Sequence, residues 1–197
     1  MYERKDHFYR KAKERGLRSR AAFKLEDLDR GVLKSGGRVV DLGCWPGGWL
    51  QVASRRVGQS GTVVGVDVRK PEPMGLANVR WIQRDVFDPR LVDEIARVLG
   101  AAADVVLSDM APALSGIRDG DEARARELVE RALAVAEQLL RPGGGFVCKL
   151  FMNADYVQLR ESIRERFDRI TTTRSEATRK GSAELYVVAL GFRRAAP

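Results

Sequence analysis

The sequence predicts an α/β fold of the Rossmann-like kind, a mostly parallel seven-stranded sheet with an antiparallel C-terminal strand and helices on both faces. Three observations carry this prediction: apolar runs alternate with helical periods, a glycine-rich turn joins a strand to a helix, and two consecutive strands end the chain. Near-continuous apolar strands need cover on both faces, which crossover helices provide. Because 197 residues suit one core, we expect a single domain over residues 18–194, preceded by a basic extension over residues 1–17.

The start of the chain is strongly basic. Residues 1–20 hold eight Lys or Arg side chains against Glu3, Asp6 and Glu14, a balance of +5, and the whole chain carries 35 − 27 = +8. A solvated or disordered tail is one interpretation of such a segment. Aromatic residues interleaved with the charges, Phe8 and Tyr9 among them, favour contact with RNA instead. The charge therefore indicates a polyanionic partner.

The remaining elements follow in order. A helix is expected over residues 20–30, because Ala22, Phe23, Leu25 and Leu28 keep helical spacing and Ser19 is a plausible cap. Strands are then predicted over residues 38–42, 62–67, 79–82, 103–108, 145–151, 169–174 and 184–192, and helices over 48–57, 89–99, 121–140 and 154–167. The last two strands are joined by a polar stretch over 175–182, which fits a final strand added antiparallel to the sheet edge. Such an ending is less typical of a dinucleotide-binding dehydrogenase.

The turn after the first strand reads DLGCWPGG over residues 41–48. Its glycines let the backbone approach a ligand closely, and the following helix offers unpaired amides. A tight turn without a ligand is the alternative. Gly43 is followed by Gly47 and Gly48, so the dehydrogenase pattern GxGxxG is not met.

Two acids extend this site. Asp67 ends the next strand, where a carboxylate accepts hydrogen bonds from both hydroxyls of an adenosine ribose in NAD and S-adenosylmethionine alike. Asp85 follows the third strand, where it suits either an adenine amino group or a helix cap. Together the turn and Asp67 predict an adenosine-type pocket.

Several other classes of protein are disfavoured. Cys44, Cys148 and the single histidine, His7, provide neither a disulfide framework nor a zinc cluster, so we expect no metal. The chain shows neither a signal peptide nor an apolar stretch long enough for a membrane. We therefore expect a cytoplasmic protein without a membrane partner.

SDMAP, residues 108–112, closes a strand at the carboxyl edge of the sheet, where ligands bind in open α/β folds. Together with RSRAAFKL (18–25), DLGCWPGGW (41–49), PGGGFVCKLF (142–151) and SAELYVV (182–188), it closely resembles the FtsJ, or RlmE, family of ribosomal RNA ribose methyltransferases. The resemblance runs from about residue 18 to residue 191. Five ordered motifs are far more specific than one glycine-rich loop.

The resemblance implies 2'-O-methylation, with S-adenosylmethionine, of a ribose in 23S ribosomal RNA, with a uridine as the nucleotide and the assembled large subunit as the partner of a monomeric enzyme. The family's catalytic tetrad falls on Lys24, Asp109, Lys149 and Glu184, with Lys149 as the base or the group that stabilises the developing alkoxide. The family's cofactor contacts fall on Gly47, Trp49, Asp67, Asp85 and Asp109. The family's turn usually reads DLGAAPGG, and Cys44 and Trp45 replace its two alanines here, which puts the local shape of the pocket in doubt.

RNA contacts are expected from the basic extension with Arg18 and Arg20, and from Arg174, Arg179 and Lys180 before Glu184.

The tetrad residues also have ordinary structural interpretations: Lys24 could be a solvated helix residue, and Glu184 could be a charge on an edge strand. Such an interpretation fits Lys149 less well, because it interrupts an apolar run in a strand expected to be buried, where a lysine is rarely found without a function.

Three other functions stay open. The tetrad alone does not exclude methylation of transfer or messenger RNA. A noncatalytic RNA-binding module with a degenerate cofactor fold and an NAD-dependent oxidoreductase are weaker alternatives, the first because the tetrad is intact and the second because of the glycine spacing.

Overall fold

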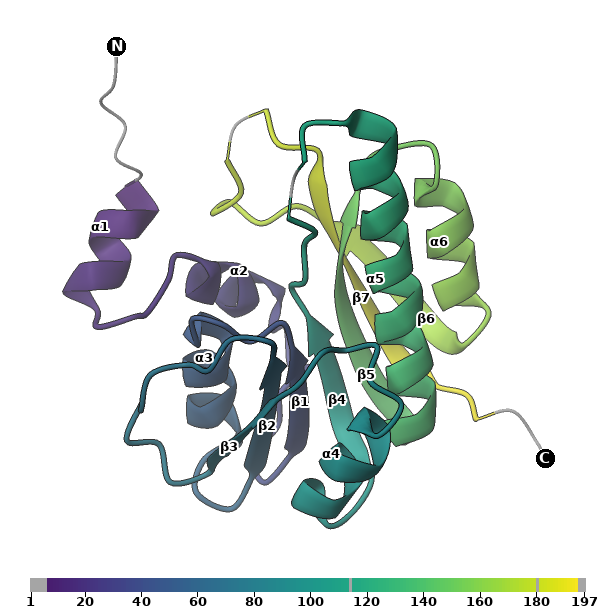
Figure 1. Ribbon diagram of the computed structural model, residues 1–197. Helices are drawn as coiled ribbons and strands as arrows, with labels where there is room; N and C mark the ends of the chain where they lie inside the picture. Colours follow the sequence, from purple (N-terminus) through teal and green to yellow (C-terminus); the bar gives the residue numbers. More distant parts are fainter. Residues whose placement is uncertain (1–6, 114, 180, 195–197) are drawn as a thin grey trace.

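The computed structural model describes residues 7–113, 115–179 and 181–194. It is a seven-stranded sheet with the strand order β3-β2-β1-β4-β5-β7-β6 and helices on both faces (Figure 1). The strands are β1 (Arg38–Leu42), β2 (Thr62–Asp67), β3 (Val79–Gln83), β4 (Ala103–Ser108), β5 (Leu140–Phe151), β6 (Phe167–Thr173) and β7 (Glu184–Phe192). The helices are α1 (His7–Glu14), α2 (Ala21–Leu28), α3 (Gly48–Val57), α4 (Leu91–Leu99), α5 (Arg118–Leu139) and α6 (Tyr156–Arg164).

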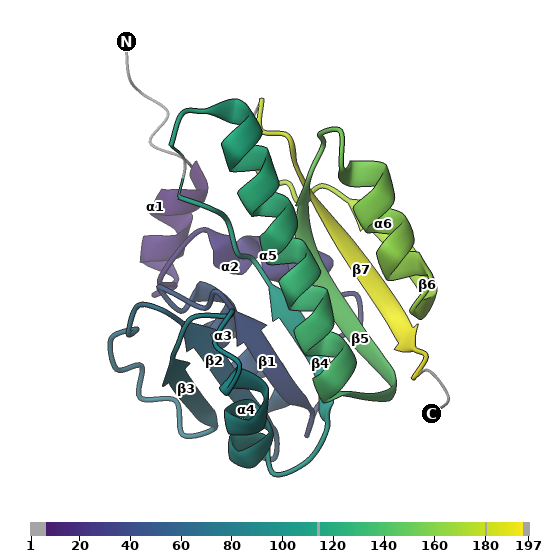
Figure 2. The same ribbon diagram turned by 45° about the vertical axis from the view of Figure 1, so that its right-hand side comes forward.

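Two apolar cores sandwich the sheet. One core packs α4, α5 and α6 against the face that lies toward the viewer in Figure 2. The other packs α2 and α3 against the opposite face, and it includes Ala12 of α1 and Leu17. The predicted α/β class with covered faces is therefore confirmed. None of the helices in the described parts of the chain is long and apolar enough to cross a bilayer.

The strand directions follow the prediction with one correction. Strands β1 to β5 pair in parallel, and β7 pairs antiparallel with β5. The C-terminal strand is antiparallel as predicted, but it lies between β5 and β6 and not at the edge of the sheet. Most of β7 from Leu185 to Ala189 is buried, and neighbouring strands pair with both of its edges.

The helices differ from the sequence predictions at several ends, and the predicted helix over residues 154–167 is shorter, at Tyr156–Arg164. Residues 7–14 form α1, although a solvated or disordered tail was one interpretation of this segment; the predicted features of residues 1–6 lie outside the described residues. Helix α5 begins at Arg118 and not at Asp121, because the Asp121 carboxylate accepts hydrogen bonds from the Ser115 and Gly116 amides and fixes the preceding loop. Ser19 does not cap α2, since Arg20 is the capping residue and the buried Ser19 hydroxyl has no partner in the described chain.

The sheet has a topological switch point between β1 and β4. On one side of it the chain continues through β2 and β3, and on the other through β5. Loops that leave the carboxyl ends of two such strands diverge and open a crevice, which is where open α/β sheets bind ligands. The turn over residues 43–48 follows β1 and Asp109 follows β4, so both predicted motifs lie at this crevice.

Candidate active site

The four residues of the predicted tetrad come from four elements and meet at the carboxyl edge of the sheet. Lys149 of β5 lies directly opposite Tyr186 of β7, and Glu184 lies two residues before Tyr186 on the same face of β7. Asp109 follows β4, the parallel neighbour of β5. Lys24 reaches the group from α2.

These side chains form one continuous chain of polar contacts. Lys24 Nζ donates to Glu184 Oε1 at 2.5 Å and to the Tyr186 hydroxyl at 3.0 Å. That hydroxyl lies 2.8 Å from Asp109 Oδ1 and 3.0 Å from Glu184 Oε1. Lys149 Nζ donates to the Asp109 backbone oxygen at 2.6 Å and lies 3.1 Å from Asp109 Oδ1. The structure thus brings together all four predicted residues.

Tyr186 is the residue of this network that sequence reasoning missed. It is fully buried, and its ring packs against Trp49 at 6.0 Å between centroids. Burial, followed by the negative charges of Asp109 and Glu184, raises the pKa of the Tyr186 phenol far above its usual value, so the hydroxyl keeps its proton. Because a phenol has one proton, Tyr186 donates to one carboxylate at a time and accepts from Lys24. Its place in the SAELY motif was the available signal.

Both lysines are enclosed. Lys24 and Lys149 are each 6% exposed, so the interpretation of Lys24 as a solvated helix residue is wrong. Burial alone would raise the pKa of Glu184, but the hydrogen bond and positive charge of Lys24 outweigh it and hold this pKa below its usual value. Two cations face two carboxylates, an arrangement that offsets the large desolvation penalty of buried charge.

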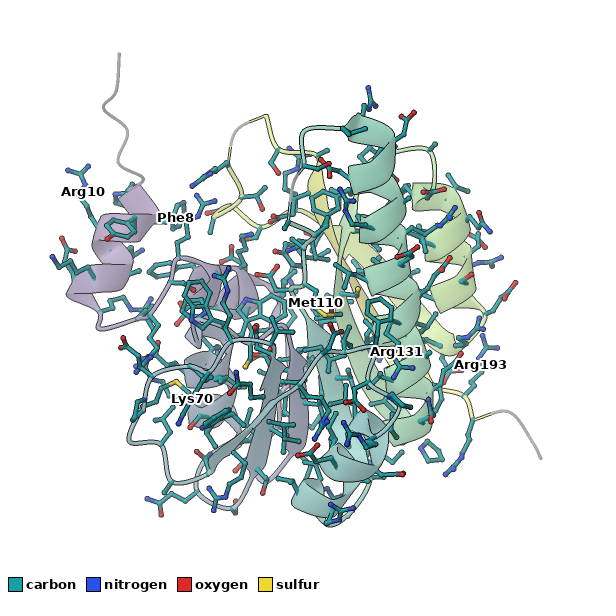
Figure 3. The ribbon with its side chains drawn as sticks, viewed as in Figure 1. Phe8, Arg10, Lys70, Met110, Arg131 and Arg193 are labelled. Atoms are coloured by element: carbon teal, nitrogen blue, oxygen red, sulfur yellow. The ribbon has the colours of Figure 1, made fainter. Side chains whose placement is uncertain are left out.

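The glycine turn lies across the switch point from this network. Gly43 has a φ of +78°, and a Cβ there would lie 2.6 Å from the Met110 Cγ atom. Met110, labelled in Figure 3, is the neighbour of Asp109. Gly47, the N-cap of α3, has a φ of +107°, and a Cβ there would lie 2.8 Å from the Met74 sulfur. Glycine is required at both positions by conformation and by space.

Asp67 is held rigidly beside the turn. Its two carboxylate oxygens accept hydrogen bonds from the backbone amides of Trp45 and Arg69, both at 2.9 Å. Each oxygen retains a lone pair, so the carboxylate can still accept from two vicinal hydroxyls. Asp85 is exposed and accepts from the Phe87 amide at 2.9 Å. It does not cap α4, which follows Arg90.

Trp49 differs from the other predicted cofactor residues. Its side chain is buried, and its indole N–H donates to the Ala21 carbonyl at 2.8 Å. The indole therefore fastens α3 to α2. Only the backbone of Trp49, in the first turn of α3, remains at the pocket, where helix amides lack intrahelical partners.

Asp41 is a second feature that the sequence prediction left out. Its carboxyl group is fully buried, and neither oxygen has a hydrogen-bond partner within the described residues. Burial, together with the charges of Asp109 and Asp67, raises the pKa of this carboxyl well above its usual range. Burial also raises the pKa of the neighbouring Cys44 thiol. Asp41, two residues before Gly43, is therefore an uncharged acid enclosed in the sheet.

The basic residues expected to bind RNA lie around this edge with unequal freedom. Arg18 donates to the Pro73 carbonyl at 2.6 Å and lies 3.9 Å from Glu72, so it ties the loop between β2 and β3 to the N-terminal segment. Arg174 and Arg179 are exposed, and Lys180 lies outside the described residues. On α1, Arg10 points away from the body of the protein (Figure 3).

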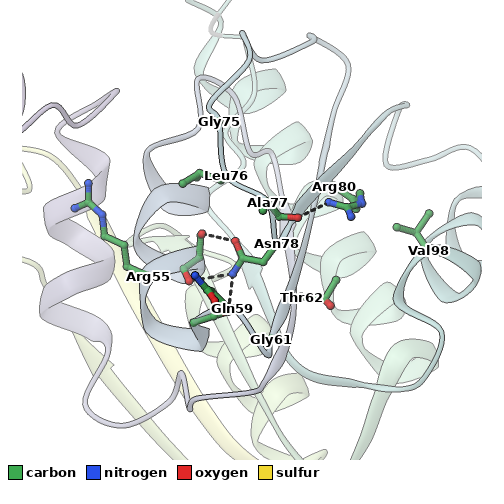
Figure 4. Close-up of a pocket in the computed structure, with 12 residues that line it drawn as sticks. Arg55, Gln59, Gly61, Thr62, Gly75, Leu76, Ala77, Asn78, Arg80 and Val98 are labelled. Carbon is green, nitrogen blue, oxygen red and sulfur yellow. Dashed lines mark hydrogen bonds between the residues drawn. The ribbon is translucent and has the colours of Figure 1, made fainter.

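A cavity of about 840 Å³ lies elsewhere, at the amino end of β2 (Figure 4). The Asn78 amide forms part of its wall and is fixed by hydrogen bonds with Ser54 and Gly58. Thr62, which begins β2, also lines it. In a parallel sheet the beginnings and ends of strands lie at opposite edges, so this cavity is not the pocket beside the tetrad despite its size. No cluster of metal-ligating side chains occurs in the part of the chain that the structure describes.

Comparison with known proteins identifies the family and the fold. The FtsJ-like methyltransferase family matches residues 17–192. A ribosomal RNA large subunit methyltransferase E from Methanothrix thermoacetophila is 46% identical over 94% of this chain and 72% of its own length. The protein of the same name from Syntrophobacter fumaroxidans is 44% identical over 98% of both chains. A crystal structure of a candidate ribosomal RNA methyltransferase from Plasmodium falciparum has a TM-score of 0.77 at 27% identity, covering 89% of this chain and 98% of that one.

Proposed function

We propose that this chain, which belongs to the FtsJ-like methyltransferase family, transfers a methyl group from S-adenosylmethionine to a ribose 2'-hydroxyl of large-subunit ribosomal RNA. The observation that carries the proposal is the buried network of Lys24, Asp109, Lys149, Glu184 and Tyr186 at the switch point. An enclosed, charge-balanced group of this kind suits the activation of a weakly acidic hydroxyl.

The residues of the turn fit the cofactor. Asp67 would accept from the ribose hydroxyls, Asp85 from the adenine amino group, and the backbone around Gly47 and Trp49 would hold the amino-acid end, with Asp109 at the methyl end. When bound, S-adenosylmethionine supplies a methyl group that is already activated by the positive charge on sulfur.

The protein's part in the reaction is to orient and activate the hydroxyl. In-line displacement needs the ribose oxygen, the methyl carbon and the sulfur to be nearly collinear, and such positioning supplies several kcal/mol of the barrier. Lys149 would take the hydroxyl proton as a neutral amine, or would stabilise the negative charge that develops on oxygen as an ammonium group. Asp109 fixes Lys149, and Tyr186 and Glu184 fix Lys24, so the two lysine side chains hold their places.

The finer assignments rest on family likeness and on charge. We propose a uridine of 23S ribosomal RNA as the target, on the assembled large subunit, and a cytoplasmic monomer that needs no metal. Residues 18–194 would form the methyltransferase domain. The basic segment over residues 1–17, with Arg18, Arg20, Arg174 and Arg179, would bind RNA mainly through phosphates.

The test is methyl transfer from labelled S-adenosylmethionine to purified large ribosomal subunits, free ribosomal RNA and transfer RNA, with the product nucleoside identified by mass spectrometry. A 2'-O-methylated nucleoside in ribosomal RNA is the expected result. Label in transfer RNA alone would keep the reaction and replace the substrate. Cofactor binding without transfer to any RNA would overturn the enzymatic proposal in favour of an RNA-binding module.

A further inference from the structure

Two tryptophans are exposed on the side of the sheet formed by β1, β2 and β3, and each is covered on one side by a cation. The Trp45 side chain, 47% exposed, lies in the turn after β1, with the Arg69 guanidinium carbon 4.9 Å from its ring centroid. Trp81, 37% exposed, lies on β3, with Lys70 Nζ 5.0 Å from its ring. We call these four residues the aromatic–cation patch.

The two cations have no carboxylate partner. Among the described residues neither Arg69 nor Lys70 forms an ion pair, and the nearby Glu72 pairs with Arg18 instead. An exposed tryptophan gains no core packing, and an unpaired cation on its face gains only a modest cation–π attraction. Exposed aromatic rings next to unpaired cations are the composition of single-strand nucleic-acid sites.

The part of the patch that carries Trp45 lies near the active-site network. The turn that carries Trp45 begins at Gly43, which contacts Met110 beside Asp109. Strand β1 is the direct neighbour of β4 and lies two strands from β5, so about 10 Å separates the ends of β1 and β5. A strand of RNA whose target ribose lies at Lys149 can therefore reach Trp45 with an adjacent nucleotide.

Trp45 is also where this chain departs from the turn sequence usual in the family, which has alanine there. The Trp45 side chain has no role in the core, because it is exposed. The contact with Asp67 is made by the backbone amide of Trp45 and not by its side chain. A bulky side chain placed at the rim of the pocket instead changes what the rim can contact.

We propose that the aromatic–cation patch binds unpaired bases of the RNA that flank the methylated nucleotide, with Trp45 and Trp81 stacking on bases and Arg69 and Lys70 contacting phosphates. This inference rests on the proposed function and adds a substrate-binding surface to it. Charge decides between RNA and the cofactor's adenine as the occupant: a cofactor with a sulfonium gains nothing from two added cations, whereas an RNA strand does.

The test measures two affinities for the full chain and its variants. One is the Kd for a short, unstructured, fluorescein-labelled RNA by anisotropy, and the other is the Kd for S-adenosylmethionine by calorimetry. Trp45→Ala is expected to weaken RNA binding about tenfold and Trp45→Phe less. Trp81→Ala, on β3 and outside the cofactor turn, is expected to weaken RNA binding with unchanged cofactor affinity. Val157→Ala, which removes an apolar side chain 67% exposed on α6, is the matched control and should leave both affinities unchanged.

Lys70→Gln adds a readout that a structural role would not move. It is expected to reduce the slope of log Kd against log salt for RNA by about 0.7. Unchanged RNA affinity in Trp45→Ala and Trp81→Ala would overturn the patch, and so would a loss confined to cofactor affinity. Methyl transfer by the wild-type protein is measured in parallel. If the wild type transfers methyl groups but the variants bind RNA normally, only the patch is refuted. If the wild type transfers none, the proposed function is refuted, and the RNA affinities of the variants still decide whether the patch binds RNA.

Discussion

Tyr186→Phe tests whether the tetrad works as one network or as two separate ion pairs. The substitution keeps the ring that packs against Trp49 and removes only the hydroxyl. That hydroxyl accepts from Lys24 at 3.0 Å and donates to Asp109 at 2.8 Å or to Glu184 at 3.0 Å. It is the group that joins the Lys24–Glu184 pair to the Asp109–Lys149 pair.

The size of the effect follows from what remains. Lys24 keeps Glu184 at 2.5 Å, and Asp109 keeps Lys149 at 3.1 Å, so no buried charge loses every partner. The free energy of unfolding should therefore fall by about 1.5–3 kcal/mol, the contribution of hydrogen bonds to charged groups. The loss of transition-state stabilisation should be of similar size, because a displacement of about 1 Å at a reacting group can lower kcat about 100-fold, which corresponds to about 2.7 kcal/mol.

Urea unfolding followed by circular dichroism gives the stability, and single-turnover methyl transfer to large ribosomal subunits gives the rate. We expect a lower kcat with unchanged KM for RNA and unchanged cofactor affinity. Tyr156→Phe is the matched control, because its hydroxyl makes one neutral contact with Thr172 at 3.3 Å on the opposite face. If Tyr186→Phe matched Tyr156→Phe in both stability and kcat, the network would be two independent pairs and the reasoning would be refuted.

Three further variants separate the roles of the site. Lys149→Ala should lower kcat by at least about 100-fold, as removal of a charge-stabilising donor does, with unchanged cofactor affinity in calorimetry; near-normal turnover would contradict the mechanism. Asp67→Ala should weaken cofactor binding at least about tenfold, because it removes the charge-assisted hydrogen bonds to the two ribose hydroxyls, and an unchanged Kd would contradict its role. Asp41→Asn should be more stable than wild type at neutral pH in urea unfolding. The native carboxyl, whose pKa is raised, keeps its proton while the unfolded one ionises above about pH 4, so the difference should vanish below that pH, and a pH-independent difference would contradict the assignment.

Local sequence predicted most of the fold, because burial dictates it. The apolar runs over residues 38–42, 62–67 and 103–108 became β1, β2 and β4 with those boundaries, since each is covered on both faces. The position of β7 between β5 and β6 was not predictable in this way. The sequence of β7 indicates a strand with buried side chains, and such a strand could lie at the edge of the sheet or inside it. Its actual position depends on pairing with β5 and β6, whose residues are distant in the sequence.

The site shows the same division. The four charged residues were predicted from motifs, but the role of Tyr186 depends on Lys24 and Asp109, which are 162 and 77 positions away. The Asp41 carboxyl was hidden for a similar reason, since its lack of partners appears only when the surrounding elements are assembled. A motif identifies which residues are present, whereas hydrogen-bond partners depend on tertiary structure.

The geometry around Lys149 bears on which of its two roles the protein uses. An ammonium group has three N–H donors. Lys149 donates one of them to the Asp109 backbone oxygen at 2.6 Å, and the Asp109 carboxylate lies 3.1 Å away as its ion-pair partner. A further donor can therefore serve a ribose oxygen in a position that is 6% exposed, where a charge-assisted hydrogen bond is stronger than in water. Acting as a base would require Lys149 to give up one of these protons first. The arrangement therefore favours stabilisation of the developing alkoxide, with the network holding the ammonium group in place.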